Sequence, residues 1–124
     1  MTETVTMYRP VGKSELVLIE EADFKAYPPR LPDQPIFYPV LNETYARQIA
    51  KDWNSRLNDD KLGFVTRFKV KKSVADQYKP EIVGGKTHEE IWVPAEELTA
   101  FNEAIVGQIE VIAKYAEDEL VWEE

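Results

Sequence analysis

The fold is decided by an alternating stretch in the middle of the chain, Phe64-Val65-Thr66-Arg67-Phe68-Lys69-Val70. Successive side chains of a β-strand point to opposite faces of the sheet, so the two phenylalanines share one face with Thr66 and Val70. Arg67 and Lys69 lie on the other face. This pattern predicts a half-buried strand, and the rest of the chain must supply the sheet and the helices that cover it.

The flanking segments predict a mixture of strands and helices. We expect further strands over residues 5–9, 81–83, 88–93 and 109–115, with alternate residues from Ile109 to Tyr115 on one face. We expect helices from an N-cap at Ser14 to Glu21, from an N-cap at Asn42 to Trp53, and from Pro94 until Gly107 stops the helix. The helical faces predicted to be buried include Leu16, Val17, Ile19, Tyr45, Ile49 and Trp53. Because strands and helices follow no strict βαβ rhythm, we predict a single α+β domain over residues 1–116, with a mixed or mostly antiparallel sheet and about three helices.

Composition excludes several classes of protein. The chain has 124 residues and no cysteine, so it has neither a disulfide framework nor a thiol nucleophile. It has one histidine, and no spacing recommends a metal site. No apolar run approaches the roughly 20 residues of a membrane-spanning helix, and the N-terminus does not resemble a signal peptide. We therefore expect a cytoplasmic protein without a membrane partner.

The charge is strongly acidic and concentrated at the C-terminal end. The net charge is −8, and residues 117–124 carry five acids and no base. Binding to nucleic acid needs many cations against the phosphates, so we do not expect a nucleic-acid partner. The acidic tail is interpreted as a solvated, frayed terminus, with steering of a basic partner as the alternative.

Residues 26–39 hold five of the eight prolines and form neither a regular helix nor a central strand. The stretch also contains large side chains, Tyr27, Leu31, Phe37 and Tyr38, which a flexible linker would leave without a role. A rigid, packed loop that presents a binding surface fits these residues. The alternative is a proline-stiffened crossover without a functional role.

The strongest candidate for chemistry is the segment that follows Gly84-Gly85. On a strand, His88, Glu90 and Trp92 share one face, whereas Ile91 and Val93 point toward the core. Glu90 then stands between an imidazole and an indole, where a carboxylate can orient a polar group of a substrate. The alternative is an exposed strand face with a His–Glu pair of little energetic value.

A second candidate lies at the end of the first strand, where Tyr8 precedes Arg9. The arginine side chain offers a rigid fork for a phosphate or a carboxylate. The alternative is a solvated arginine, and Tyr38 can likewise be a core or rim residue instead of a stacking platform.

Together these segments resemble a family of small, mostly bacterial proteins labelled "ADP-ribosylation/crystallin-like". The resemblance covers residues 7–112 and rests on Tyr8-Arg9-Pro10-Val11-Gly12, Tyr27-Pro28-Pro29-Arg30-Leu31-Pro32, the segment 35–42, the helix 45–53, Gly84-Gly85, His88-Glu89-Glu90, the segment 92–98 and Gly107-Gln108-Ile109-Glu110-Val111. The order of elements resembles a minimal ADP-ribosyltransferase-type domain. That resemblance implies NAD as cofactor or ADP-ribose as ligand.

The same resemblance implies roles for individual residues. Arg9 would anchor the phosphates or ribose of NAD, Tyr38 would stack on nicotinamide, and Glu90 would be the catalytic carboxylate. Tyr8, His88 and Trp92 complete the predicted ligand-binding set. The resemblance implies a nucleotide-related protein that binds NAD or ADP-ribose, either as a binding protein or as an enzyme of the ADP-ribosyltransferase type.

Two other kinds of protein fit the same residues. A non-enzymatic module would bind a protein or peptide in a groove walled by prolines and aromatic side chains. An assembly subunit would pair the exposed edge of its sheet in a homodimer. An enzyme pocket should be concave and contain Arg9 and Glu90, whereas a docking module should show a flat apolar patch.

Overall fold

The computed structural model describes residues 3–55, 60–82 and 88–124. The elements along the chain are β1 (Thr4–Val11), α1 (Lys13–Glu21), β2 (Ile36–Phe37), α2 (Glu43–Ile49), the π-helix η1 (Ala50–Asn54), β3 (Leu62–Lys71), α4 (Lys72–Ala75), β4 (Glu81–Ile82), β5 (Glu89–Glu90), β6 (Val93–Pro94), the 3-10 helix η2 (Ala95–Glu97), α5 (Leu98–Glu103), β7 (Ile105–Ala116) and β8 (Glu119–Glu123). Among the described residues no helix is long and apolar enough to cross a membrane.

The main sheet has the strand order β1-β3-β7-β8. The short pair β4–β5 continues it on the β1 side, because Val40 forms one bridge to Tyr8 of β1 and another to Glu90 of β5. The pair β2–β6 forms a separate two-stranded sheet. Every pairing described is antiparallel. The α+β class with an antiparallel sheet is therefore confirmed.

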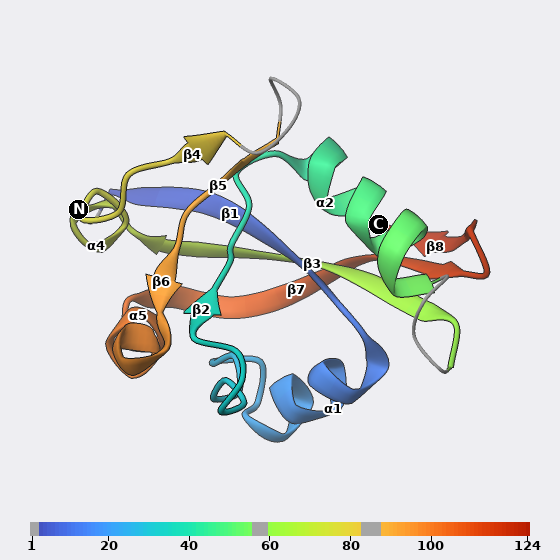
Figure 1. Ribbon diagram of the computed structural model, residues 1–124, viewed down its shortest axis with the longest axis horizontal. Helices are drawn as coiled ribbons and strands as arrows, with labels where there is room; N and C mark the ends of the chain where they lie inside the picture. The colour runs from blue at the N-terminus through green and yellow to red at the C-terminus, as the bar shows by residue number, and fades with distance from the viewer. Residues whose placement is uncertain (1–2, 56–59, 83–87) are drawn as a thin grey trace.

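Helices cover both faces of the sheet (Figure 1). On one face, Ala46 of α2 and Ala50 of η1 pack with Val65 of β3 and Ala113 and Tyr115 of β7. On the other face lies the larger core, to which α1 and α5 contribute together with the proline-rich loop. Its aromatic centre consists of Tyr27, Phe37, Phe68 and Phe101, whose rings meet at tilted or edge-to-face angles. These pairs favour one specific packing of the core.

The alternating stretch Phe64–Val70 forms the centre of β3. Phe64, Phe68 and Val70 are buried, as predicted, in the larger core. Val65 is buried as well, because α2 and η1 cover the other face of the strand at this end. The strand is half-buried only from Arg67 onward, where Arg67 and Lys69 reach solvent.

The predicted last strand is longer than expected and changes face at a β-bulge. Thr66 of β3 pairs with Val111 and Val65 pairs with Ala113, so Ile112 is the extra residue on β7. The bulge reverses the alternation: Ile109 packs in the larger core, whereas Ala113 packs beneath α2. The prediction that alternate residues from 109 to 115 share one face is therefore wrong.

Other expected boundaries also differ from the structure. The N-cap of α1 is Gly12 and not Ser14, and Asn42 caps α2 as predicted, with its Oδ1 accepting from the backbone N–H of Tyr45 at 3.0 Å. Val17 and Trp53 are exposed instead of buried. The helix that follows Pro94 ends at Glu103; Gly107 does not stop it but lies within β7 with φ +79°.

The acidic C-terminal end is not frayed. Residues 117–118 form a turn with positive φ angles, and β8 then pairs with β7 as the edge of the main sheet. Arg47 and Arg67 hold its end through ion pairs with Glu123 and Glu124 at 3.0 and 2.9 Å. Sequence patterning missed this strand because its five residues are all exposed and five acids surround its apolar centre.

Candidate functional site

A proline opens the sheet at the place where the candidate residues gather. Tyr8 and Val40 exchange two backbone hydrogen bonds of 2.8 Å each. The antiparallel register would next pair Pro10 with Tyr38, but Pro10 has no N–H to donate toward that side. The Arg9 guanidinium reaches the carbonyl of Tyr38 instead, with Nη1 3.5 Å from the oxygen. The ladder therefore ends after a single pair.

A cleft of about 400 Å³ lies beside this break. It is lined by residues from β1, the proline-rich loop, α2, η1 and the segment of β5: Arg9, Pro10, Tyr38, Val40, Ile49, Asn54, Glu90 and Trp92. We call it the Trp92 cleft. The fold thus brings four of the predicted site residues, which are up to 83 positions apart in the chain (92 − 9), into one concavity.

The predicted alternation around Glu90 holds, although the predicted strand does not. Residues 88–93 do not form one strand: β5 ends at Glu90, and β6 begins at Val93. Ile91 and Val93 are nevertheless buried, and the indole of Trp92 lies outside. Trp92 Nε1 donates to Glu90 Oε1 at 3.1 Å, and this bond fixes the carboxylate against the ring. Residues 83–87, including Gly84-Gly85, lie outside the described residues.

Tyr38 completes an aromatic corner with Trp92. The two ring centroids are 6.4 Å apart and the planes stand at 87°, an edge-to-face arrangement. Both side chains are partly open to solvent, with exposed fractions of 39% for Tyr38 and 46% for Trp92. The corner therefore presents aromatic surface to anything that enters the cleft.

Arg9 is already neutralised within the chain. Its Nε and Nη2 donate to the two carboxylate oxygens of Glu15 at 2.7 and 3.0 Å, a bidentate pair between β1 and α1. The guanidinium also lies 4.6 Å from the ring centroid of Phe37, and Arg9 is only 8% exposed. An anionic ligand would have to compete with Glu15 for the same donors.

His88 lies in a neighbouring cleft that shares Ile49 with the first. This cleft, of about 440 Å³, is lined by Tyr45, Gln48, Ile49, Trp53 and His88. The imidazole stacks on Tyr45 with the centroids 4.2 Å apart and the planes at 11°. Burial, and then the charge of Glu90, raise the pKa of Tyr45. Glu90 thus acts electrostatically on both clefts.

Tyr8 is the one predicted site residue outside both clefts, because its side chain packs into the core beneath α2. Sequence reasoning missed Pro10, Ile49 and Asn54 as cleft residues. Their place in the cleft could not be predicted from the sequence, because α2 and η1 reach the cleft only by packing over β3. The π-helical turn that places Asn54 has no recognisable sequence pattern.

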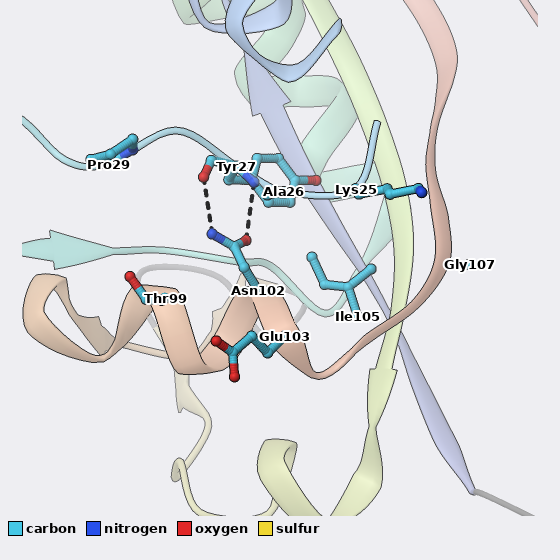
Figure 2. Close-up of a pocket in the computed structure, with 9 residues that line it drawn as sticks. All are labelled: Lys25, Ala26, Tyr27, Pro29, Thr99, Asn102, Glu103, Ile105 and Gly107. Atoms are coloured by element: carbon cyan, nitrogen blue, oxygen red, sulfur yellow. Dashed lines mark hydrogen bonds between the residues drawn. The ribbon is translucent and has the colours of Figure 1, made fainter. Parts of the chain in front are cut away.

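A third cavity, of about 530 Å³, is lined by the start of the proline-rich loop, α5 and the start of β7. Figure 2 shows Asn102 of α5 between this helix and the Tyr27 segment. The amide of Asn102 accepts from the N–H of Tyr27 and donates to its carbonyl, both at 3.0 Å. The Asn102 amide therefore holds the Tyr27 segment of the loop against α5.

No family model, curated protein or solved structure matches the chain. Within residues 3–55, 60–82 and 88–124, no group of three or more His, Cys, Asp or Glu side chains is arranged to hold a metal ion. The chemistry of the Trp92 cleft must therefore be read from its own groups: one carboxylate, two aromatic rings, an internally paired arginine and an apolar floor.

Proposed function

We propose that this chain is a non-catalytic binding module that takes a side chain of a peptide or partner protein into the Trp92 cleft. The observation that carries this proposal is the pairing of Arg9 with Glu15. It removes the one cation among the described lining residues from ligand binding and leaves aromatic and apolar walls beside the Glu90 carboxylate. Walls of proline and aromatic side chains are typical of peptide-recognition surfaces.

The shape of the cleft supports insertion of a side chain. The site is an open cleft that contains Arg9 and Glu90, as expected of an enzyme pocket, but Arg9 is paired with Glu15, and the apolar side chains of Val40 and Ile49 are among its lining residues. Trp92 and Tyr38 are partly exposed, and large aromatic side chains in such positions carry much of the binding energy at protein interfaces. We therefore expect one inserted residue to dominate the affinity.

Selection from a library of random displayed peptides tests this function. Binders recovered on the wild-type chain should lose at least about tenfold in affinity on Trp92→Ala, as for a central interface aromatic. The matched control is Trp122→Ala, which removes an exposed indole of β8 that does not line the cleft. Failure to recover any binder, or binders equally sensitive to both substitutions, would overturn the proposal.

A second candidate function is binding of NAD or ADP-ribose in an ADP-ribosyltransferase-like domain. It is favoured by one observation: Arg9, Tyr38 and Glu90 line the same concave cleft, as a nucleotide site with those roles requires. In that proposal Tyr38 would stack on a ring, and Glu90 would accept from a ribose hydroxyl. Arg9 would have to exchange Glu15 for the pyrophosphate.

This second function has its own test. Calorimetric titration with NAD and with ADP-ribose should give saturable binding that Arg9→Ala weakens. If any cleavage of NAD is observed, Glu90→Gln should abolish it. Absence of binding at millimolar ligand would exclude the nucleotide function and leave the binding module standing.

A further inference from the structure

The ionised groups that line the Trp92 cleft leave a negative charge. Among the described residues that line the cleft, only Arg9 and Glu90 are charged, and Glu15 neutralises Arg9. Within the part of the chain that the structure describes, no cation pairs with Glu90, whose carboxylate accepts from the neutral indole of Trp92. The same charge is one of the two causes that raise the pKa of Tyr45 in the adjoining cleft. Arg30 lies within electrostatic range of Arg9, Glu15 and Tyr38, but it is not among the lining residues and its Nε donates to the carbonyl of Ile36. A ligand beside Trp92 therefore meets the Glu90 carboxylate as the adjacent charge.

The polar groups of the cleft are short of hydrogen-bond donors. Glu90 Oε1 accepts from Trp92, and Oε2 has no hydrogen-bond partner within the described part of the chain. The wall also contains Asn54, whose buried Oδ1 has no partner among the described residues. The carbonyl of Tyr38 receives only the long bond from Arg9. The site is therefore suited to a ligand that donates hydrogen bonds.

The rings of Trp92 and Tyr38 provide a second attraction for a cation, in addition to the Glu90 carboxylate. The faces of indole and phenol rings carry negative potential and attract cations, most strongly when water is excluded. Trp92 and Tyr38 stand nearly perpendicular to each other, and the Glu90 carboxylate is bonded to the indole edge. A cation in the cleft would contact a ring face and a carboxylate together.

Resting on the function proposed above, we propose that the inserted group is a cation, the ammonium of a lysine or the guanidinium of an arginine in the partner. Glu90 is its counter-ion, Trp92 and Tyr38 form the aromatic walls, and Val40 and Ile49 contact the aliphatic stem. The pairing of Arg9 with Glu15 keeps the chain's own cation from occupying that position.

Titration with a minimal pair of probes tests this assignment. The probes are n-butylammonium chloride, which mimics the end of a lysine side chain, and n-butanol, which has a similar stem without the charge. The readout is the indole Nε1–H resonance of Trp92 in ¹H–¹⁵N spectra at matched ionic strength. Trp53 and Trp122 serve as internal controls. We expect butylammonium to shift the Trp92 resonance saturably, with an affinity at least about tenfold above that of butanol.

Two variants of neighbouring glutamates sharpen the test. Glu90→Gln keeps the size of the side chain and an acceptor for Trp92 but removes the charge, and it should abolish the preference for butylammonium. Glu89→Gln removes the same charge from the adjacent residue, which does not line the cleft, and should retain the preference. Equal shifts by the two probes, no shift by either, or a preference that survives Glu90→Gln would overturn the assignment.

The outcomes separate this inference from the function on which it rests. Peptides that bind through Trp92 but tolerate replacement of every lysine and arginine by norleucine would leave the binding module intact and exclude a cationic ligand. A cleft that prefers butylammonium while the library yields no binder would exclude peptide recognition and keep the preference for cations.

Discussion

Substitution of Gly63 by alanine tests how the cleft is built. Gly63 lies in β3 directly beneath η1. A methyl group at this position would overlap the carbonyl oxygen of Ala50 and stand 2.9 Å from Asn54 Cβ. That carbonyl accepts the N–H of Ser55, the i→i+5 bond of the π-helical turn. This hydrogen bond restrains the Ala50 carbonyl, so η1 must move away from β3 to make room for the methyl group.

The expected cost follows from this overlap. Overpacking of a well-ordered core costs about 1–3 kcal/mol, and contact with backbone places Gly63→Ala at about 3 kcal/mol. For a domain of this size, each kcal/mol lowers Tm by roughly 4 °C, which gives a fall of about 12 °C in a thermal melt followed by circular dichroism. Because Ile49 and Asn54 line the cleft, ligand affinity should fall as well.

Gly107→Ala is the matched control. Gly107 has φ +79°, but nothing lies within 4 Å of the added methyl group. Its cost is limited to the unfavourable left-handed backbone, about 1–2 kcal/mol or roughly 4–8 °C in Tm, with ligand binding unchanged. If Gly63→Ala melts no lower than Gly107→Ala, the close approach of η1 to β3 and the explanation of the cleft are wrong.

Three further substitutions test single interactions. Glu15→Gln should lower the free energy of unfolding by about 2–3 kcal/mol, because it leaves Arg9 buried without its counter-ion. The same substitution should strengthen phosphate binding measured by calorimetry. Unchanged stability would show that the pair is not formed. Asn102→Ala should cost about 2 kcal/mol in chemical denaturation, because two backbone groups of Tyr27 lose their partner, whereas a cost near zero would mean that water replaces the amide. Asn42→Ala should cost about 1 kcal/mol, and Asn42→Asp should restore it, unless the cap bond contributes nothing.

The sequence contained enough to predict the fold class and the faces of its central elements. Where burial follows a simple period, as for Phe64, Phe68 and Val70 of β3 and for Ile91 and Val93, the pattern identified buried side chains correctly, although it missed Val65. The cap at Asn42 was predictable for the same reason, because its chemistry is local. These features depend on neighbours in the chain.

Features that depend on distant partners were not predictable. The bulge at Ile112 arises from the pairing of β7 with β3 and reverses the faces that a simple alternation assigns. The acidic end becomes a strand because β7 offers it an edge and two arginines, Arg47 and Arg67, hold its carboxylates. Although β7 is joined to β8 by a short hairpin, the two arginines lie far from β8 in the sequence.

The candidate site shows the same division. Arg9, Tyr38, Glu90 and Trp92 could be singled out as chemically unusual residues, and the structure places all four in one cleft. The ion pair between Arg9 and Glu15 depends on how α1 packs against β1. This pair is the reason that we propose a cationic and not an anionic ligand. Residue types thus indicated which side chains gather in the cleft, and the geometry underlies the ligand charge that we propose.

The central claim is that the Trp92 cleft binds a side chain and not a nucleotide. It is tested most directly by calorimetric titration of one wild-type sample with a selected peptide, with NAD and with ADP-ribose, repeated on Trp92→Ala. We predict saturable binding of the peptide that Trp92→Ala weakens by at least about tenfold, and no saturable heat from either nucleotide. Saturable binding of NAD or ADP-ribose that Arg9→Ala abolishes would contradict the claim.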